Sequence, residues 1–581
     1  MGVQLTEKRR MDQGLRVLIV GSVACGPKVA CRLKRLDPSA KITILERGRD
    51  ISYGACGMPY FISGMVDRIE ALSETPVGVL RDVDFFKKVK DVEILCEREA
   101  IAIDRDGKSV KVRDPESRAE SSLSYDKLVL ATGGRPLRPP IPGIDAKGVQ
   151  AFHSLRDANQ LHAVLVGGNV ENVVLVGAGL IGIEMAEALV ERGLGVTMIE
   201  MFDWVMPALL DEEMGRLAGK HLLAKGVNLA MGSAVTEFVK DGDGNLASVK
   251  TEKGEYPTDL ALVAMGVRPN NELASEAGLA IAANGGIIIN EYCQTSDPDI
   301  YAGGDCVANP YLHPVMGKPL FTPQGSTSNK QGRIIANHIA GKVESFPGVL
   351  GTVICKAFDF TIGRAGISER WARELNLEVE TVLWTGPDRP HYMQGALPLT
   401  IKLVVQRNTR RLVGLQVVGP GDAAKRLDVA ITAMTLGASL DQIAHLDLAY
   451  APPYAPPIDP LLTAVHVIQN KLDGIARGIP PLAAKKKIET EDVTLLDVRS
   501  PQEFEELGLP YDVVHIPLGA LRSQCDAIPR DKEVLAFCKV SLRGYEAQRI
   551  LDEKGFERVS FIEGGLVGWP FELRSGMSMK P

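Results

Sequence analysis

The 581-residue sequence lacks any run of about 18 apolar residues, which predicts that no segment spans a membrane. Its N-terminus has no apolar stretch typical of a signal peptide, so residues 1–13 are predicted to be a short tail, with Met11 a candidate start. No basic stripe is present and the formal net charge is −7, which argues against a nucleic-acid partner. These absences favour a cytoplasmic protein with neither a membrane nor a nucleic-acid partner.

Paired cysteines are also missing. The nine cysteines are scattered and form no C-x-x-C motif, which excludes a disulfide framework and indicates reduced thiols in a cytoplasm. Most of them are expected in the core, and no metal site is predicted. What is present is an ordinary globular composition, 45% hydrophobic and 24% charged, in a chain long enough for about three or four domains.

The N-terminal region shows the order strand, glycine turn, helix, strand and acid. The apolar strand at 16–20 leads into GSVACG and a helical stretch, and the next strand ends in Glu46. This order predicts a dinucleotide site, with pyrophosphate at the helix N-terminus and Glu46 on a ribose diol. Val23 replaces the usual middle glycine. The candidate cofactor contacts are Gly21, Val23, Ala24, Gly26, Glu46, Arg47 and Ser52.

The same order recurs in a cleaner form. The strand at 172–176 leads into GAGLIG and a helix, and the following strand ends in Glu200. Gly177 is expected to make the tight turn, Gly179 to let backbone approach phosphate and Gly182 to let the helix pack on the strand. A carboxylate at position 200 would bond a free 2′-hydroxyl and repel a 2′-phosphate, which favours NADH over NADPH.

Further strand-and-glycine segments complete the pattern. KLVLATGGRP at 127–136 and DIYAGGDCV at 299–307 are each a strand running into a glycine turn. Asp305, which follows the glycine turn of DIYAGGDCV, is a candidate to hold a ribityl hydroxyl. The additional cofactor candidates are Thr132, Gly133, Gly266, Gly304 and Asp305.

The motifs GSVACG, SYGACGMPY, LATGG, GAGLIG, AMGVRPN and YAGGDC occur in an order that resembles the FAD-dependent pyridine nucleotide-disulfide oxidoreductases. The resemblance covers roughly residues 14–470. It implies an α/β fold with two Rossmann-like domains, one for FAD and one for NADH, followed by an α+β dimerisation domain and a homodimer.

The cysteine segment resembles one branch of that family. Cys56 has no second cysteine nearby, and SYGACGMPY resembles the signature of the coenzyme A-disulfide reductases, with Tyr53 in place of Phe. This implies a single redox cysteine that faces the flavin and alternates between thiolate and an oxidised sulfur form. Tyr392 and Tyr454 resemble tyrosines that reach the partner subunit's redox site, with Tyr450 as the rival of Tyr454. Arg32 and Arg35 are possible contacts for coenzyme A phosphates, although a solvated helix face is the favoured role.

The C-terminal hundred residues resemble a rhodanese domain of α/β fold. DVRSPQEF precedes a loop from Cys538 to Arg543 that lies between a predicted strand and a predicted helix. The resemblance implies that the loop, the helix dipole and Arg543 favour a thiolate or persulfide at Cys538. Asp497 and Arg499 are expected to be structural. The usual G-H-I-x-G-A segment is shortened, with His515 assigned to a later strand, which leaves full sulfurtransferase activity open.

These features predict a reductase that takes electrons from NADH through FAD to persulfide, polysulfide or CoA disulfide. The alternatives are an NADH oxidase or peroxidase with a sulfenate at Cys56, and a non-catalytic redox sensor. The predicted domains are the FAD domain at 14–165 and 296–345, the NADH domain at 166–295, the dimerisation domain at 346–470, a linker or connecting helix at 471–488 and the rhodanese-like domain at 489–581.

Overall fold

The computed structural model describes residues 14–312 and 317–575, so the predicted tail at 1–13 lies outside the described residues. Contacts divide the chain into two compact units. The first runs to Gly177 and includes Met185–Thr197 and Val235–Val349, and the second comprises Ala178–Glu184, Met198–Ala234 and the chain from Leu350 onward. Within the described ranges, every helix is too short or too polar to cross a bilayer.

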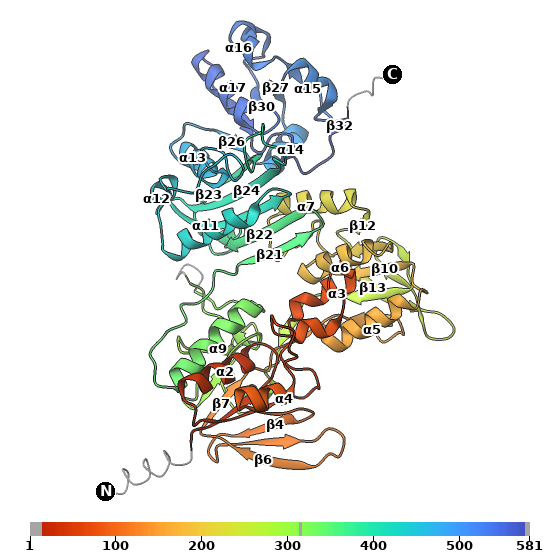
Figure 1. Cartoon of the computed structure of the whole chain (residues 1–581). Coiled ribbons are helices and arrows are strands. Elements are labelled where there is room, and N and C mark those ends of the chain that lie inside the picture. The colour runs from red at the N-terminus through yellow and green to blue at the C-terminus, as the bar shows by residue number, and fades with distance from the viewer. Residues whose placement is uncertain (1–13, 313–316, 576–581) are drawn as a thin grey trace. The chain divides into compact units, whose positions relative to one another are not determined.

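The first unit contains a five-stranded sheet with the order β19-β7-β1-β2-β3, in which all neighbouring strands are parallel. Strand β7 of this sheet is labelled in Figure 1. Its strands are rich in Val, Ile and Leu because a parallel sheet is covered on both faces. Helix α2 (Cys25–Leu36) packs against helix α9 (Gly325–Ile339) beside this sheet. The strands are β1 (Arg16–Val20), β2 (Lys41–Leu45), β3 (Glu93–Leu95), β7 (Lys127–Leu130) and β19 (Ile300–Ala302).

A second five-stranded sheet has the order β12-β11-β10-β16-β9, with α6 (Leu180–Val190) following β10. Its central pair, β10 with β16, is parallel and almost completely buried. The strands are β9 (Val149–Ala151), β10 (Asn172–Val176), β11 (Gly195–Ile199), β12 (Val227–Ala230) and β16 (Leu260–Val263). The two glycine turns predicted from the sequence therefore each follow a strand of a Rossmann-like sheet.

The second unit contains an antiparallel sheet of order β21-β22-β25-β24-β23, against which α11 (Ala423–Thr435) and α13 (Pro460–Leu472) pack. Its strands are β21 (Val353–Ala357), β22 (Phe360–Gly366), β23 (Val379–Pro387), β24 (Pro398–Gln406) and β25 (Arg411–Gly419). The seven central residues of both β24 and β25 are buried. This is the sheet expected of the dimerisation domain.

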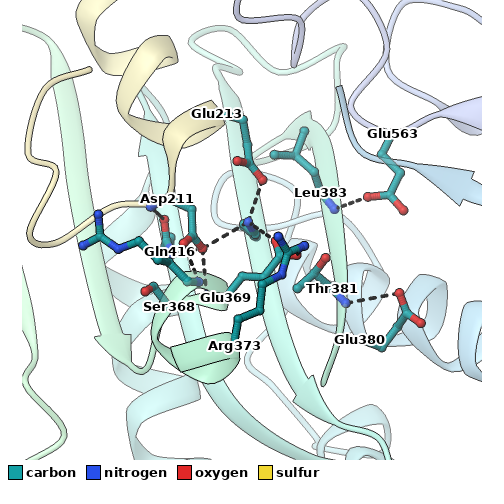
Figure 2. Close-up of polar contacts among 12 residues, drawn as sticks. Asp211, Glu213, Ser368, Glu369, Arg373, Glu380, Thr381, Leu383, Gln416 and Glu563 are labelled. Carbon is teal, nitrogen blue, oxygen red and sulfur yellow. Dashed lines mark hydrogen bonds and ion pairs between the residues drawn. The ribbon is translucent and has the colours of Figure 1, made fainter. Parts of the chain in front are cut away.

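A buried ammonium group lies within that sheet. Lys402 of β24 is 2% exposed, and its Nζ lies 3.0 Å from Asp211, 2.6 Å from Glu213 and 2.7 Å from Glu369. Figure 2 shows the three carboxylates converging. Burial alone would lower the pKa of Lys402, but the carboxylates raise it above its ordinary value. Because Glu213 belongs to α7 (Glu212–Ala224), the cluster fixes α7 to the sheet.

The C-terminal part is a parallel sheet of order β26-β31-β30-β27-β29. Its strands are β26 (Gly478–Ile479), β27 (Val493–Asp497), β29 (Val514–His515), β30 (Glu533–Phe537) and β31 (Val559–Ile562), and its helices are α14 (Pro481–Thr490), α15 (Pro501–Glu506), α16 (Leu518–Gln524) and α17 (Leu542–Glu553). The predicted linker at 471–488 therefore contains β26 and the start of α14. The predicted α/β fold class is confirmed.

Candidate active site

The predicted flavin contacts gather at one edge of the first sheet. Gly21 follows β1, Glu46 follows β2, Gly133 lies after β7 and Asp305 lies after β19, and the carboxyl ends of parallel strands share one edge. The Glu46 carboxylate accepts hydrogen bonds from the Ser22 N–H (3.1 Å) and hydroxyl (2.7 Å). This clusters an acid, a glycine turn and a helix N-terminus where a dinucleotide would bind.

The first glycine turn is sterically confined on one side. Gly21 has a φ of +109°, and a Cβ there would lie 2.1 Å from the Ala131 carbonyl oxygen. A Cβ at Gly26 would lie 2.0 Å from the Gly21 oxygen. Only glycine therefore lets the turn and the following helix approach so closely. Val23 and Ala24 lie in the turn before α2, half-buried, so the missing middle glycine has not altered the strand-turn-helix path.

Two further predicted contacts are held by Asn270, which sequence reasoning did not assign. The Thr132 hydroxyl donates to the Asn270 carbonyl (2.7 Å), the Asn270 side chain donates to the Thr132 carbonyl (2.8 Å), and the Asn270 N–H donates to the Gly133 carbonyl (2.9 Å). Gly266, with φ +108°, accepts from the Leu137 N–H. The AMGVRPN motif contains both Gly266 and Asn270, and it is the sequence feature that could have identified Asn270.

Asp305 is a partly desolvated acid. Burial raises the pKa of its carboxyl above the ordinary value, although the Ser328 hydroxyl (3.4 Å) and the Gln324 backbone N–H both donate to it. Gly304 precedes it with φ +85°. Because burial removes this carboxylate from water, a hydroxyl donor supplied by a bound ligand, such as a ribityl chain, would offset part of that cost. Arg47 is exposed beyond β2.

The second glycine turn repeats the geometry of the first. Gly177 has φ +107°, and a Cβ there would lie 2.5 Å from the Ala264 carbonyl oxygen. A Cβ at Gly179 would meet nothing within 4 Å, which leaves room for a phosphate against the backbone. Gly182 is buried in α6. Glu200 is buried and accepts from the Ala178 N–H at 3.0 Å, as Glu46 does from Ser22.

Cys56 lies on the 3-10 helix η1 (Ala55–Gly57), directly before α3 (Met58–Ser63), and is the one exposed cysteine of the nine. Ser52 is buried with φ +50°, and its N–H donates to the Ser22 carbonyl at 2.8 Å. This bond fixes the cysteine segment to the first glycine turn. Burial, followed by the Glu46 charge, raises the pKa of Tyr53 to about 12, so its phenol stays protonated.

The loop after β30 holds the other candidate cysteine. Cys538 is fully buried, and its carbonyl accepts from the Leu566 N–H at 3.0 Å. Ser541 has φ +89°, and within the described structure its buried hydroxyl has no hydrogen-bond partner. The loop runs into the first turn of α17, where the helix dipole favours an anion.

Arg543 connects Cys538 with an acid that sequence reasoning missed. It donates two hydrogen bonds of 2.7 Å to Glu503, which lower the pKa of that carboxyl to about 2. These bonds, together with the Cys538 thiol, raise the pKa of Arg543. Glu503 forms a capping box with Ser500. The S-x-x-E spacing is the sequence feature that could have identified Glu503. Asp497 and Arg499 form a buried pair at 2.6 Å, as expected of structural residues.

The three candidate tyrosines are exposed. Tyr392, Tyr450 and Tyr454 are 66%, 51% and 69% exposed, so none is committed to the core of its own chain. The Tyr454 carbonyl accepts from the buried Arg426 at 3.4 Å, which positions the backbone of its segment. Arg32 donates to Asn337 at 2.9 Å, whereas Arg35 is exposed.

Two Rossmann-like folds, an exposed cysteine beside the first glycine turn and a second cysteine loop define a dinucleotide-dependent sulfur oxidoreductase fused to a rhodanese fold. Family models agree: pyridine nucleotide-disulphide oxidoreductase at residues 15–325, its dimerisation domain at 352–460 and a rhodanese-like domain at 481–571. The chain belongs to the pyridine nucleotide-disulphide oxidoreductase family, whose members use FAD and NAD(P)H.

Three similar proteins illustrate the relationship. The NAD(P)H coenzyme A polysulfide/persulfide reductase of Pyrococcus horikoshii is 35% identical over 78% of this chain and 98% of its own. The structure of an NAD-dependent persulfide reductase from A. fulgidus has a TM-score of 0.90 and 44% identity, covering 96% of this chain and all of that one. The structure of Bacillus anthracis CoADR-RHD has a TM-score of 0.89 and 32% identity, covering 96% and 98%.

Proposed function

We propose that the chain is an NADH-dependent reductase of persulfides, polysulfides or CoA disulfide. The observation that carries the proposal is the combination, in one chain, of an exposed cysteine beside a flavin-type glycine turn and a second cysteine in a rhodanese loop. An oxidase or a peroxidase has no use for a sulfur-carrying loop, and a redox sensor has no use for a turnover cysteine. The A. fulgidus protein, which is similar over 96% of this chain, is named an NAD-dependent persulfide reductase.

The edge of the first sheet suits FAD. Glu46 would accept from the adenosine ribose, Asp305 from the ribityl chain, and the Gly21 turn with the N-terminus of α2 would hold the pyrophosphate. Bound FAD would supply the two-electron chemistry that links a nicotinamide to sulfur. Thr132 and Gly133, locked by Asn270, keep the intervening loop in place.

In this proposal, the sulfur group bound to Cys56 accepts the electrons that the flavin receives from NADH. As thiolate, Cys56 attacks a disulfide or persulfide, forming an S–S bond and releasing the other sulfur group. Tyr392 and Tyr454, from the partner of a homodimer, would donate a proton to the leaving thiolate, with Tyr450 as the alternative to Tyr454. Their exposure leaves them available for that role, and the matched dimerisation domain favours the dimer.

NADH is the proposed donor rather than NADPH. The Glu200 carboxylate is fixed against the Ala178 N–H at the second glycine turn, where it can bond a ribose 2′-hydroxyl. A 2′-phosphate at the same place would face like charge without a compensating arginine from the turn. The kcat/KM for NADH is therefore expected to exceed that for NADPH.

Cys538 is the proposed carrier of sulfane sulfur. Arg543 and the N-terminus of α17 would stabilise the persulfide anion there, and Cys56 would receive the sulfur by way of a mobile thiol such as coenzyme A. Small CoA disulfides would reach Cys56 without Cys538.

Steady-state NADH consumption with polysulfide, with CoA disulfide and with oxygen as acceptors tests the proposal. Rapid turnover with sulfur acceptors and slow turnover with oxygen are expected. Turnover with oxygen alone would favour the oxidase, and the absence of turnover with all three would favour the sensor.

A further inference from the structure

The outer edge of the dimerisation sheet is closed by side chains rather than by another strand. Within the described ranges, β23 is the last strand of this sheet and pairs with β24. Thr381 and Leu383, two positions apart, direct their backbone groups to the same side, away from β24. The Lys471 ammonium donates to the Thr381 carbonyl at 2.8 Å, and the Leu383 N–H donates to the Glu563 carboxylate at 2.9 Å. The open edge of β23 is therefore occupied by α13 and by the residue after β31.

The pair that closes this edge is buried and charged. Glu563 is 1% exposed, and the Lys471 Nζ lies 2.6 Å from its carboxylate and 3.1 Å from that of Glu380. Figure 2 shows the bond between Glu563 and Leu383. Burial alone would lower the pKa of Lys471, but the two carboxylates raise it above its ordinary value, so the ammonium stays charged. Because the loss of either partner would leave a buried charge uncompensated, the pair ties the rhodanese fold to the sheet.

Glu563 begins the glycine segment EGGLVG, which contacts the dimerisation sheet on one side and the cysteine loop on the other. Gly564 has φ +73°, and a Cβ there would lie 2.3 Å from the Cδ2 of Leu383. Gly565 has φ +56°, and a Cβ there would lie 2.4 Å from the Cys538 carbonyl oxygen. The positive φ angles and the close approach on both sides require glycine at these two positions.

The same segment holds the cysteine loop through its backbone. The Leu566 N–H donates to the Cys538 carbonyl at 3.0 Å, and the Val567 N–H donates to the Lys539 carbonyl at 3.1 Å. Leu566 is the third residue after Glu563, and both intervening glycines are confined by their contacts. A displacement of Glu563 from the sheet edge would therefore move the donors that hold the loop.

Strand β23 also leads to a residue of the proposed reduction site. Its last residue, Pro387, is five positions before Tyr392, which is proposed above to donate a proton in the partner subunit's redox site. The strand that binds Glu563 thus continues into the segment that carries Tyr392. One strand is therefore connected both to the cysteine loop and to a residue of the reductase site.

We propose that Glu563 is a positioning residue for the reaction: it fixes the Cys538 loop to the edge of the dimerisation sheet, so that the rhodanese fold works docked on that sheet rather than as a tethered module. This rests on the proposed function. Reduction of CoA disulfide needs Cys56 but not the Cys538 loop, so it does not depend on the docking. Loss of Glu563 should therefore separate polysulfide turnover from CoA disulfide turnover.

Hydrogen exchange of the FAD-loaded full chain, without any substrate, tests the positioning directly. E563A removes the acceptor of the Leu383 N–H, so the amides of Leu566 and Val567 should exchange about tenfold faster than in the wild type. E563Q retains an oxygen that can accept from Leu383, and its exchange should lie between those of the wild type and E563A. The matched control, E557A, removes an exposed carboxylate before β31 and should exchange like the wild type.

Turnover separates positioning from a general structural role, which would lower both sulfur activities together. In E563A, kcat with polysulfide should fall about fivefold, while turnover of CoA disulfide and the KM for NADH stay at wild-type values. K471M leaves Glu563 buried without its cation and should show the same selective loss. E563Q/K471M removes both charges, so it should recover part of the polysulfide turnover that K471M loses.

Wild-type exchange of both amides in E563A, or an equal loss of polysulfide and CoA disulfide turnover, would overturn the inference. If E563A fails to fold, as judged by its flavin absorbance, the comparison of K471M with E563Q/K471M decides, and wild-type exchange in both would overturn it. Faster exchange of the Leu566 and Val567 amides in variants of a protein that reduces no sulfur acceptor with NADH would instead refute the proposed function and leave the docking of the loop standing.

Discussion

The two candidate cysteines have opposite environments. Cys56 is exposed on a short 3-10 helix tied to the first glycine turn, whereas Cys538 is buried at the end of a central strand, with its loop bonded to Leu566 and Arg543 beside it. An exposed thiol can meet many sulfur acceptors directly. A buried one can be reached only by a reagent that passes the loop, so it suits selective loading. The difference indicates that Cys56 performs the common reduction and Cys538 serves a subset of substrates.

Removal of the exposed thiol should have the largest effect. C56S should lower NADH-dependent reduction of every sulfur acceptor by about a thousandfold or more, because no second cysteine accompanies it in its segment. The flavin absorbance should be retained. Anaerobic NADH consumption with CoA disulfide and polysulfide measures it, and a C96S variant, whose thiol is half-buried, is the matched control. Sulfur turnover retained in C56S would remove the distinction between the two cysteines.

Alkylation should sharpen the same comparison. Iodoacetamide should modify Cys56 about a hundredfold faster than Cys538 in the folded protein, because reaction requires an accessible thiolate. Mass spectrometry of timed digests measures both rates. Equal rates, or faster labelling of Cys538, would show that burial in the loop does not protect it.

Removal of the buried thiol should be selective. C538S should reduce polysulfide turnover by about tenfold and leave CoA disulfide turnover unchanged, since only sulfane sulfur needs the loop nucleophile. Free coenzyme A should stimulate polysulfide turnover in the wild type and have little effect in C538S. The ratio of the two activities measures this selectivity. An unchanged ratio in C538S would mean that the rhodanese domain takes no part in the reaction.

The smallest expected effect concerns the acid beside the buried cysteine. Arg543 lowers the pKa of Glu503 from 4.5 to about 2, so the pair stabilises the folded loop above pH 4.5 and loses this contribution as the pH falls toward 2. E503Q should therefore destabilise the loop by about 1 kcal/mol at neutral pH and by less in acid. Hydrogen exchange across α17 measures the difference, and a pH-independent difference would contradict the assignment.

Features of the two candidate sites that depend on short stretches of the chain could be predicted from the sequence. The glycine turns, the strands before them and the acids Glu46 and Glu200 lie within one strand-turn-helix unit, and the structure places each at a strand end. The strand at 533–537 and the helix after the Cys538 loop were likewise expected. Both sites thus follow from short-range patterns whose backbone geometry is fixed by a few glycines.

What could not be predicted depends on contacts between distant segments. The burial of Cys538, the Glu503–Arg543 pair and the Lys402 cluster each join residues far apart in sequence, and periodicity contains no information about such partners. The Pro-Pro and the lysine run predict a linker at 471–488, whereas the structure places β26 there, paired with the distant strand β31. The domain boundaries and the roles of the site residues stay predictions.

The central claim is that electrons from NADH reach sulfur rather than oxygen. The most direct test is anaerobic turnover of polysulfide with simultaneous measurement of NADH consumed and sulfide released. One sulfide should appear for each NADH oxidised, and both NADH oxidation and sulfide release should stop in C56S. NADH oxidation without sulfide release, or turnover only after oxygen is admitted, would contradict it.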